Sequence, residues 1–296
     1  MKDYVKHQHR LGFYQASPTP SDSDLRKYYR KYFCKNTSSP AFGVTYAENY
    51  LPEEKIYFLN RGVVAEHILD GLSLHRKTKS MIDVGCGEGF LAAYFERQGW
   101  EVECCDFSST GVERQNPQLL SSFQQGDIFQ ILKTKIREAK RYDFVSLYNV
   151  LEHVRDPLGL LDDVKKIMHK KTVLCLAVPN DFSDFQKLLT GKGFTGETWF
   201  LPPEHLNYFT FKSMRNLLSD RKLKILKMLT DFPVELYLFN QHSNYWADRS
   251  KGKQAHLSRV AVTNFLFDQG VEKYIAYMEA AANCNFGRSI IAFVTK

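Results

Sequence analysis

The 296-residue sequence contains no long hydrophobic run and no regular cysteine pattern. No apolar stretch reaches the roughly 18 residues that a helix needs to cross a bilayer. The charged start, residues 1–10, is not followed by the apolar segment of a secretory signal. The six cysteines form no Cys-x-x-Cys pair and show no spacing typical of a disulfide framework. These absences argue against a membrane span and against disulfide staples, and they predict a cytoplasmic location.

The chain carries only a modest excess of positive charge. The net charge is +7, and the lysines and arginines are dispersed along the chain. This balance is typical of a solvated basic surface, although it also allows an anionic substrate, such as a phosphorylated or nucleotide-linked molecule, or RNA. We therefore expect a small-molecule substrate and no nucleic-acid partner. The sequence carries no signal for the oligomeric state.

The apolar content predicts one large α/β core. Hydrophobic residues make up 44% of the chain, enough to bury such a core together with an appendage. Near-continuous apolar runs at 144–148 and 172–178 are typical of strands that are buried on both faces of a parallel sheet. Two further strands are predicted over 223–230 and 289–294.

A glycine-rich turn stands between a predicted strand and a predicted helix. The strand ends in Asp83, the glycines follow as Gly85, Gly87 and Gly89, and the helix covers 91–98. Glycine allows positive φ and a bare backbone, and a helix start offers unpaired N–H groups, so a ligand can lie against this turn. Taken alone, the turn is equally consistent with a strained loop.

Two acidic residues follow at informative positions. The next predicted strand, 100–106, ends in Asp106, roughly 20 residues beyond the glycines, where a nucleotide-binding βαβ unit brings an acid to a ribose. The alternative role of Asp106 is a helix cap ahead of Ser108. Gly126-Asp127 then offers a second acid, placed to accept a hydrogen bond from an adenine amino group. Alone, this dipeptide is an ordinary turn.

In this order, the glycine turn, Asp106, Gly126-Asp127 and residues 142–154 resemble the successive motifs of class I S-adenosylmethionine-dependent methyltransferases, over roughly residues 60–230. The resemblance implies an α/β fold with a doubly wound, Rossmann-like sheet of seven mostly parallel strands, the last of them antiparallel, and S-adenosylmethionine as cofactor. It places the following residues at the cofactor: Asp83, Gly85, Cys86, Gly87, Gly89, Asp106, Phe107, Asp127, Ile128 and Asn149.

An NAD-binding domain is the competing interpretation of the same turn. Residues 87–92 also fit the dinucleotide fingerprint when its last position is alanine. Asp83, however, would oppose a pyrophosphate and suits a cationic sulfonium compound. Asp127 suits adenine and has no counterpart in the NAD pattern. These two acids favour the methyltransferase.

Two histidines are candidates for the general base. His153 lies in the segment 149–153 at the end of a predicted strand, where open α/β sheets bind ligands. His205 follows Pro202 and Pro203, which stiffen the chain ahead of it. An imidazole with an unperturbed pKa near 6.5 can take a proton from an attacking hydroxyl. A structural role stays open for both, because methyl transfer needs mostly orientation.

The sequence predicts four parts. They are an N-terminal arm and short helix (1–52), the methyltransferase core (53–232), a helical insertion (233–287) and the last core strand (288–296). The insertion is expected to form a substrate lid, because loops of this length in a compact domain are usually functional or disordered. In the first part, Tyr46 and Tyr50 are candidates to fold over the ligand.

Segments near both ends of the core resemble bacterial methyltransferases associated with surface-polysaccharide and sugar modification. The resemblance implies O-methylation of a sugar or nucleotide-sugar substrate; alternatives are N- or C-methylation of another metabolite, an NAD-dependent enzyme and a non-catalytic cofactor-binding subunit. Those relatives often carry a Cys-rich zinc ribbon that this sequence lacks, so no metal is predicted. Candidate substrate ligands, for which packing roles stay open, are Tyr208, Glu235, His242, Tyr245 and Arg288.

Overall fold

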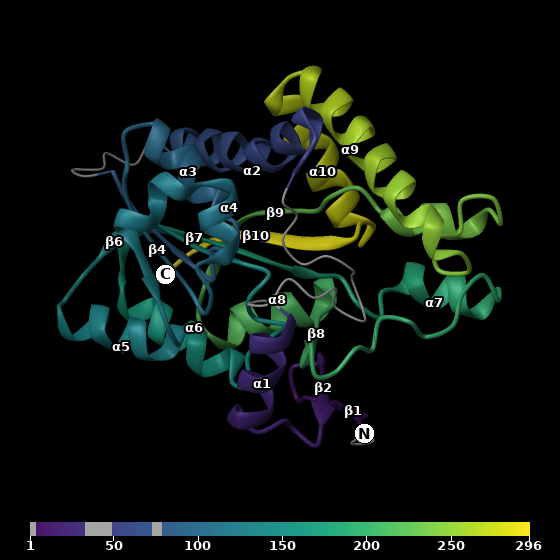
Figure 1. Cartoon of the computed structure of the whole chain (residues 1–296), viewed down its shortest axis with the longest axis horizontal. Coiled ribbons are helices and arrows are strands. Elements are labelled where there is room, and N and C mark those ends of the chain that lie inside the picture. The colour runs from purple at the N-terminus through teal and green to yellow at the C-terminus, as the bar shows by residue number, and fades with distance from the viewer. Residues whose placement is uncertain (1–3, 33–48, 73–78) are drawn as a thin grey trace.

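A seven-stranded sheet forms the centre of the protein (Figure 1). The computed structural model describes residues 4–32, 49–72 and 79–296. The strand order is β5-β4-β3-β6-β7-β10-β9. The strands are β3 (Ser80–Val84), β4 (Glu101–Asp106), β5 (Phe123–Gln125), β6 (Tyr142–Tyr148), β7 (Met168–Pro179), β9 (Lys224–Leu229) and β10 (Ser289–Thr295).

The pairing of these strands confirms the predicted fold class. β3 pairs in parallel with β4 and β6, and the parallel pairing continues to β5 on one side and β7 on the other. β10 runs antiparallel to both of its neighbours, β7 and β9. β6 lies in the middle of the sheet, and its residues Phe144, Val145 and Leu147 are fully buried, as expected for a strand covered on both faces.

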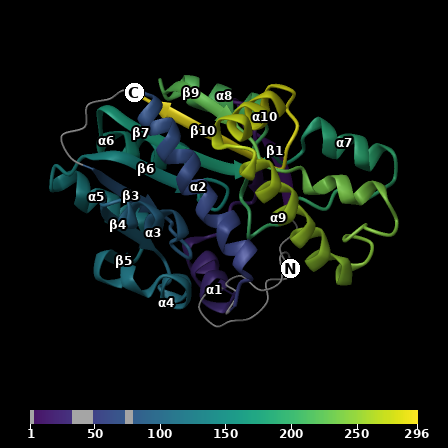
Figure 2. The same cartoon turned by 90° about the horizontal axis from the view of Figure 1, so that it is seen from above.

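Helices cover both faces of the sheet and enclose two hydrophobic cores (Figures 1 and 2). On one face, α2, α3 and α10 bury side chains such as Leu69, Phe95 and Met278. On the other face, α5, α6 and α8 bury side chains such as Leu132 and Leu160. The bounds of these helices are α2 (Pro52–Gly71), α3 (Phe90–Arg97), α5 (Ile128–Arg137), α6 (Pro157–Lys166), α8 (Phe211–Asp220) and α10 (Val271–Asn283).

The segment predicted as an N-terminal arm contains regular structure. β1 (Val5–Gln8) and β2 (Tyr14–Ser17) form a hairpin, and β8 (Asn207–Tyr208) adds antiparallel to β2. Phe13 is fully buried and joins the core beneath the main sheet. No local pattern indicated these strands, because they are short and β2 pairs with a segment far along the chain. The helix predicted after the arm is α1 (Asp22–Tyr32).

The segment after β7 and the predicted insertion also contain helices. After β7, α7 (Asp184–Gly191) is capped by Ser183, whose hydroxyl accepts a hydrogen bond from the Gln186 N–H. The later insertion contains α9 (Gly252–Asp268), which packs against α2, and α10, which packs against β9. Figure 2 shows α9 and α10 on the side of the sheet that α2 crosses. None of the described helices combines the length and apolar character that a bilayer crossing requires.

Gly62 allows α2 and α3 to pack closely. A Cβ at Gly62 would lie 2.2 Å from Cγ of Tyr94, whereas a Cβ at Gly71, in the last turn of α2, would meet nothing within 4 Å. We predict that Gly62→Ala lowers the free energy of unfolding by about 1–3 kcal/mol through overpacking. The matched Gly71→Ala should stay within about 0.5 kcal/mol of the parent protein. Chemical denaturation of both variants tests this, and equal stabilities would contradict it.

Candidate active site

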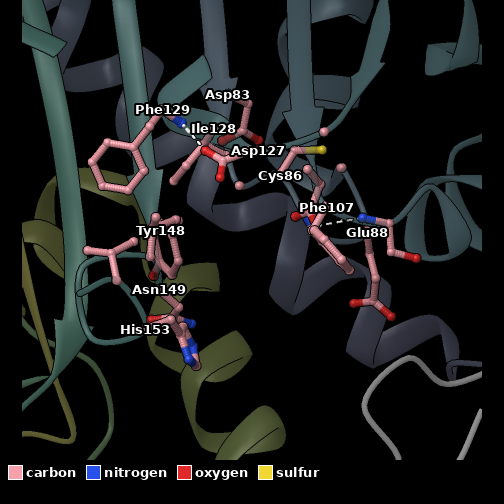
Figure 3. Close-up of a pocket in the computed structure, with 18 of the residues that line it drawn as sticks. Asp83, Cys86, Glu88, Phe107, Asp127, Ile128, Phe129, Tyr148, Asn149 and His153 are labelled. Atoms are coloured by element: carbon pink, nitrogen blue, oxygen red, sulfur yellow. Dashed lines mark hydrogen bonds between the residues drawn. The ribbon is translucent and has the colours of Figure 1, made fainter. Parts of the chain in front are cut away.

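A cavity of about 1130 Å³ opens where β3, β4, β5 and β6 end at the carboxyl edge of the sheet (Figure 3). This edge is the usual ligand site of open α/β sheets. Pockets for one small ligand typically measure about 300–1,000 Å³, so the volume suffices for a cofactor together with a small acceptor. In Figure 3, Cys86, Glu88 and Phe107 lie on one side, and Tyr148, Asn149 and His153 on the other.

The glycine turn presents bare backbone to the cavity. Gly85, Gly87 and Gly89 have φ values of 76°, 56° and 73°, in the left-handed region that favours glycine. A Cβ at Gly85 would lie 2.5 Å from Cγ2 of Val150. The N–H groups of residues 85 and 86 donate to the Cys105 carbonyl at 2.8 and 3.1 Å and hold the turn to β4. The turn therefore leaves room for a ligand that lies against the main chain.

Asp106 joins the glycine turn to the end of β4. One of its carboxylate oxygens accepts a hydrogen bond from Gly87 N–H at 2.9 Å, and the other accepts from Ser108 N–H at 3.2 Å. Burial raises the pKa of this carboxyl group. The following helix, α4 (Thr110–Gln115), has Ser109 at its cap position, so the helix-cap alternative for Asp106 was wrong. Asp106 lines the cavity, and its contact with a ribose stays a prediction.

Asp127 caps the N-terminus of α5 and also lines the cavity. It precedes α5, and its Oδ1 accepts hydrogen bonds from the N–H groups of Phe129 and Gln130 at 2.9 and 3.4 Å. Both bonds use the same oxygen, which leaves Oδ2 for an adenine amino group. Ile128 lies beside it, and Phe107, which is 38% exposed, offers an aromatic face to the same space. This end of the cavity has the chemistry that a nucleoside needs.

Asp83 places a buried acid beside the turn. The residue is only 2% exposed, and its Oδ1 has no hydrogen-bond partner in the described part of the chain. Burial raises its pKa to about 7. A buried carboxylate without a counter-charge is costly, and a cationic ligand in the cavity would compensate that cost. The residue therefore fits a positively charged cofactor.

Arg61 of α2 and Tyr50, just ahead of α2, approach the cavity near the glycine turn. Arg61 lines the cavity, with its guanidinium 4.6 Å from the ring centroid of Tyr148. Glu88 accepts a hydrogen bond from the Tyr50 hydroxyl at 2.7 Å, and burial raises the pKa of Glu88 to about 7. Tyr46, predicted with Tyr50 to fold over the ligand, lies outside the described residues. Arg61 escaped the sequence analysis because no motif marks it, although a guanidinium suits the carboxylate of an amino-acid ligand.

The two predicted base residues lie next to each other, but only one lines the cavity. His153 is on the wall, and its Nδ1 lies 2.7 Å from the Glu204 carbonyl oxygen, so Nδ1–H donates and Nε2 keeps its lone pair. Burial and the neighbouring His205 lower the pKa of His153 to about 3. His205 is 5% exposed and stands behind it, with the ring centroids 4.9 Å apart. Nδ1 of His205 lies 3.9 Å from Oδ2 of Asp181.

Backbone and amide contacts hold the loop that carries His153. The N–H groups of Leu206 and Asn207 both donate to the Glu152 carbonyl, at 2.6 and 3.1 Å. The Asn207 side-chain amide donates to the carbonyls of Leu151 and Val154 at 2.8 and 2.7 Å. The short strand β8 thereby anchors the wall of the cavity. The sequence analysis missed Asn207 because its role depends on contacts between distant segments.

Glu235 and Arg288, two of the predicted substrate ligands, belong to a buried ionic network. Arg288 Nη1 lies 2.7 Å from Oδ1 of Asp181 and 3.4 Å from Oε1 of Glu235. The Gln186 side-chain amide donates to the same oxygen of Glu235 at 3.0 Å. Arg288 and His205 favour the ionised form of Asp181 and hold its pKa below the usual range against the opposing effect of burial. Neither Glu235 nor Arg288 lines the cavity.

The other three predicted substrate ligands also lie away from the cavity wall. Tyr208 is 1% exposed, and its hydroxyl donates to the His205 carbonyl at 2.7 Å. Tyr245 packs against a small cluster that includes Trp199, and His242 is exposed. No described residue beyond position 156 lines the cavity, so the role of the helical insertion as a lid stays a prediction.

The geometry agrees with a comparison of the chain with known protein families. A family model described as a methyltransferase domain matches residues 57–228, more than half of the chain. The chain belongs to this methyltransferase family. The family and the acid-lined, bare-backboned cavity give S-adenosylmethionine as the cofactor. The nicotinamide alternative is thereby excluded as the interpretation of the glycine turn.

Individual relatives match this methyltransferase only in part. The ubiquinone biosynthesis O-methyltransferase of Nitrosomonas europaea is 30% identical over 105 residues, which are 35% of this chain and 43% of that protein. The protein of the same name from Psychrobacter cryohalolentis is 27% identical over 129 residues, which are 41% of this chain and 49% of that protein. The match therefore spans less than half the length of these curated relatives.

A solved structure supports the fold of the methyltransferase. The magnesium protoporphyrin IX methyltransferase from Synechocystis PCC 6803, crystallised with bound S-adenosylhomocysteine, superposes with a TM-score of 0.51 at 14% identity. The superposition covers 93% of this chain and 100% of that chain. At this identity the likeness shows a shared fold.

Removal of the Asp106 carboxylate should weaken cofactor binding. Asp106→Ala deletes the acceptor for Gly87 N–H and the predicted ribose ligand, and hydrogen bonds to charged groups contribute about 1.5–3 kcal/mol each. We expect the affinity for S-adenosylhomocysteine, measured by calorimetry, to fall at least about 100-fold. The control Asp70→Ala removes an exposed acid from α2 and should change nothing. Unchanged affinity in Asp106→Ala would remove its assigned role.

Cofactor affinity should depend on pH through Asp83. The free carboxyl group is protonated below its raised pKa of about 7, and a cationic ligand favours the ionised form. Binding therefore releases a proton below about pH 7, and affinity for S-adenosylmethionine should fall by up to about tenfold per pH unit as the pH drops. Asp83→Asn should bind more weakly and with a flatter profile. A wild-type profile that is flat from about pH 5.5 to about pH 8 would contradict the assignment.

Proposed function

We propose that this methyltransferase methylates a hydroxyl oxygen of a small molecule. The observation that carries the proposal is a cavity whose wall includes both the cofactor features, namely the glycine turn with Asp106 and Asp127, and the imidazole of His153. S-adenosylmethionine supplies, when bound, a methyl group on a cationic sulfur. The imidazole offers the lone pair that an acceptor hydroxyl needs for a hydrogen bond.

Residues outside the family match contribute to the acceptor end of the cavity. Thr19 and Leu25 line the cavity although the family model begins at residue 57. Leu25 packs against Leu206, the neighbour of His205, and so belongs to the same side as the imidazoles. A wall built from segments outside the family match supports an acceptor that is particular to this chain.

The protein groups at this end orient the acceptor. Nδ1–H of His153 is held by the Glu204 carbonyl, so the ring presents Nε2 to the hydroxyl. In-line displacement depends mainly on such orientation and on exclusion of water. His205, predicted as a base, is buried behind His153 and contributes by positioning that ring.

The acceptor class rests on two kinds of support. The resemblance of the sequence to glycan-associated methyltransferases favours a sugar or sugar-linked hydroxyl. The curated relatives are named ubiquinone biosynthesis O-methyltransferases. These names favour oxygen over nitrogen or carbon as the methylated atom. They also favour an acceptor from quinone biosynthesis. Both kinds of acceptor carry hydroxyl groups on a ring, and we propose a ring hydroxyl as the shared feature.

An acceptor screen tests the proposed function. The full chain is incubated with methyl-labelled S-adenosylmethionine and with two panels, nucleotide sugars and dihydroxy-aromatic compounds, and products are identified by mass spectrometry. We expect a methyl ether from one panel. Labelled amines would favour N-methylation, and tight cofactor binding without transfer to any hydroxyl would contradict the proposal.

The role of His153 is tested with the acceptor that the screen finds. His153→Gln should lower kcat at least about tenfold, because the imidazole orients the attacking hydroxyl through a hydrogen bond, while S-adenosylhomocysteine affinity stays unchanged. The control His7→Gln changes an exposed histidine on β1 and should keep wild-type turnover. Wild-type kcat in His153→Gln would remove the residue from the mechanism.

A further inference from the structure

Three side chains at the acceptor end form a compact cluster of metal-ligand type. Glu152, His153 and His205 each offer one ligand atom, and these atoms all lie within 4.8 Å of one another. The first two residues follow β6, and the third precedes β8. The hydrogen bonds from Leu206 and Asn207 to the Glu152 carbonyl bring these two segments together. The cluster is therefore built by the fold and does not depend on flexible surface side chains.

One carboxylate oxygen of Glu152 is buried without a hydrogen-bond partner among the described residues. The residue is 1% exposed, and the oxygen without a partner is Oε2. Its Oε1 lies 3.8 Å from Nε2 of His153, which is beyond hydrogen-bond distance. A buried carboxylate is normally paired with a cation or coordinates a metal. This site has an acidic oxygen available for such a cation.

The two imidazoles are oriented from behind, as metal-ligating histidines usually are. Nδ1–H of His153 donates to the Glu204 carbonyl at 2.7 Å, and Nδ1 of His205 faces the Asp181 carboxylate at 3.9 Å. Asp181 is in turn held by Arg288 at 2.7 Å. The bond to Glu204 leaves Nε2 as the coordinating atom of His153, and His205 offers one of its ring nitrogens.

We propose that Glu152, His153 and His205 bind one divalent transition-metal ion at the acceptor end of the cavity. Two imidazole nitrogens and one carboxylate oxygen suit zinc, manganese, iron or cobalt, whereas magnesium prefers an all-oxygen shell. Metal–ligand distances of about 2.0–2.2 Å imply ligand–ligand distances of about 3.4 Å in a tetrahedral site. The cluster therefore has to contract by about an ångström, and the partly exposed His153 can make this movement.

A tetrahedral or octahedral ion has coordination positions beyond the three protein ligands, and His153 is the ligand that lines the cavity. Resting on the proposed O-methyltransferase function, the ion held by Nε2 of His153 would replace the direct hydrogen bond between that nitrogen and the acceptor. It would bind two neighbouring hydroxyl oxygens of the acceptor, as on a catechol or a sugar ring, and lower the pKa of one of them. That O–H bond breaks and its proton passes to water. The oxygen then forms the new O–C bond while the C–S bond breaks, and S-adenosylhomocysteine leaves as a neutral thioether.

Metal binding is measured first, without cofactor or acceptor. The untagged full chain is stripped with a chelator and titrated with Zn²⁺, Mn²⁺ and Co²⁺ by calorimetry, and the visible absorption of Co²⁺ reports nitrogen ligation. We expect one ion per chain and at least about a tenfold loss of affinity in Glu152→Gln and in His153→Gln. The control His169→Ala removes an imidazole that lies 3.1 Å from the Asp143 carboxylate and belongs to no metal-ligand cluster among the described residues, and it should bind like the parent. Absence of one-to-one binding, or equal affinity in all variants, would overturn the proposal.

Turnover then separates the metal site from the proposed function. Activity with a catechol or a sugar diol should fall on chelation and return with the ion, and S-adenosylhomocysteine affinity should stay unchanged throughout. Full activity in metal-free protein would overturn the metal site and leave O-methylation standing. An ion that binds one-to-one in a protein that methylates no hydroxyl would support the metal site and contradict the proposed function.

Discussion

The contact between the glycine turn and β4 is the constraint on which the site depends. The N–H groups of residues 85 and 86 donate to the Cys105 carbonyl, and Gly87 N–H donates to Asp106. These hydrogen bonds hold the backbone of the turn against β4. Because the glycines of the turn have no side chain to fill the cavity, a ligand can lie against the main chain. The parallel sheet supplies the rigid frame that makes this geometry possible.

A second set of contacts connects the opposite wall to a small accessory sheet. β8 pairs with β2, and the N–H groups of Leu206 and Asn207 reach the Glu152 carbonyl. The N-terminal hairpin therefore stabilises the segment that positions His153 and His205. The imidazoles lie far apart in the chain, and only this tertiary arrangement brings them to 4.9 Å between ring centroids. This end of the cavity is thus assembled from the N-terminal segment and from distant parts of the methyltransferase core.

Local patterns predicted the sheet and the cofactor end well, because both depend on short stretches of chain. Apolar runs marked β6 and β7, and the glycine turn marked the junction between β3 and α3. The same reasoning was weaker for isolated polar residues. Glu235 and Arg288 were candidates for substrate binding, yet in the structure they pair with each other within a buried network. A charged residue in an irregular segment gives no local signal of the partner that it will meet.

The sequence by itself determined the fold class, the glycine turn and the acids that follow it, because strand periodicity, positive φ and the spacing within one βαβ unit are local properties. Only the tertiary structure decided which histidine lines the cavity, that Arg61 reaches the cavity from α2, and that Glu152, His153 and His205 lie together. The placement of the two histidines and Glu152 depends on β8 docking against the loop after β6, whereas that of Arg61 depends on the packing of α2. Hydrogen bonds of that kind join segments that are far apart in the chain. The sequence of either segment therefore does not indicate which other segment it will contact.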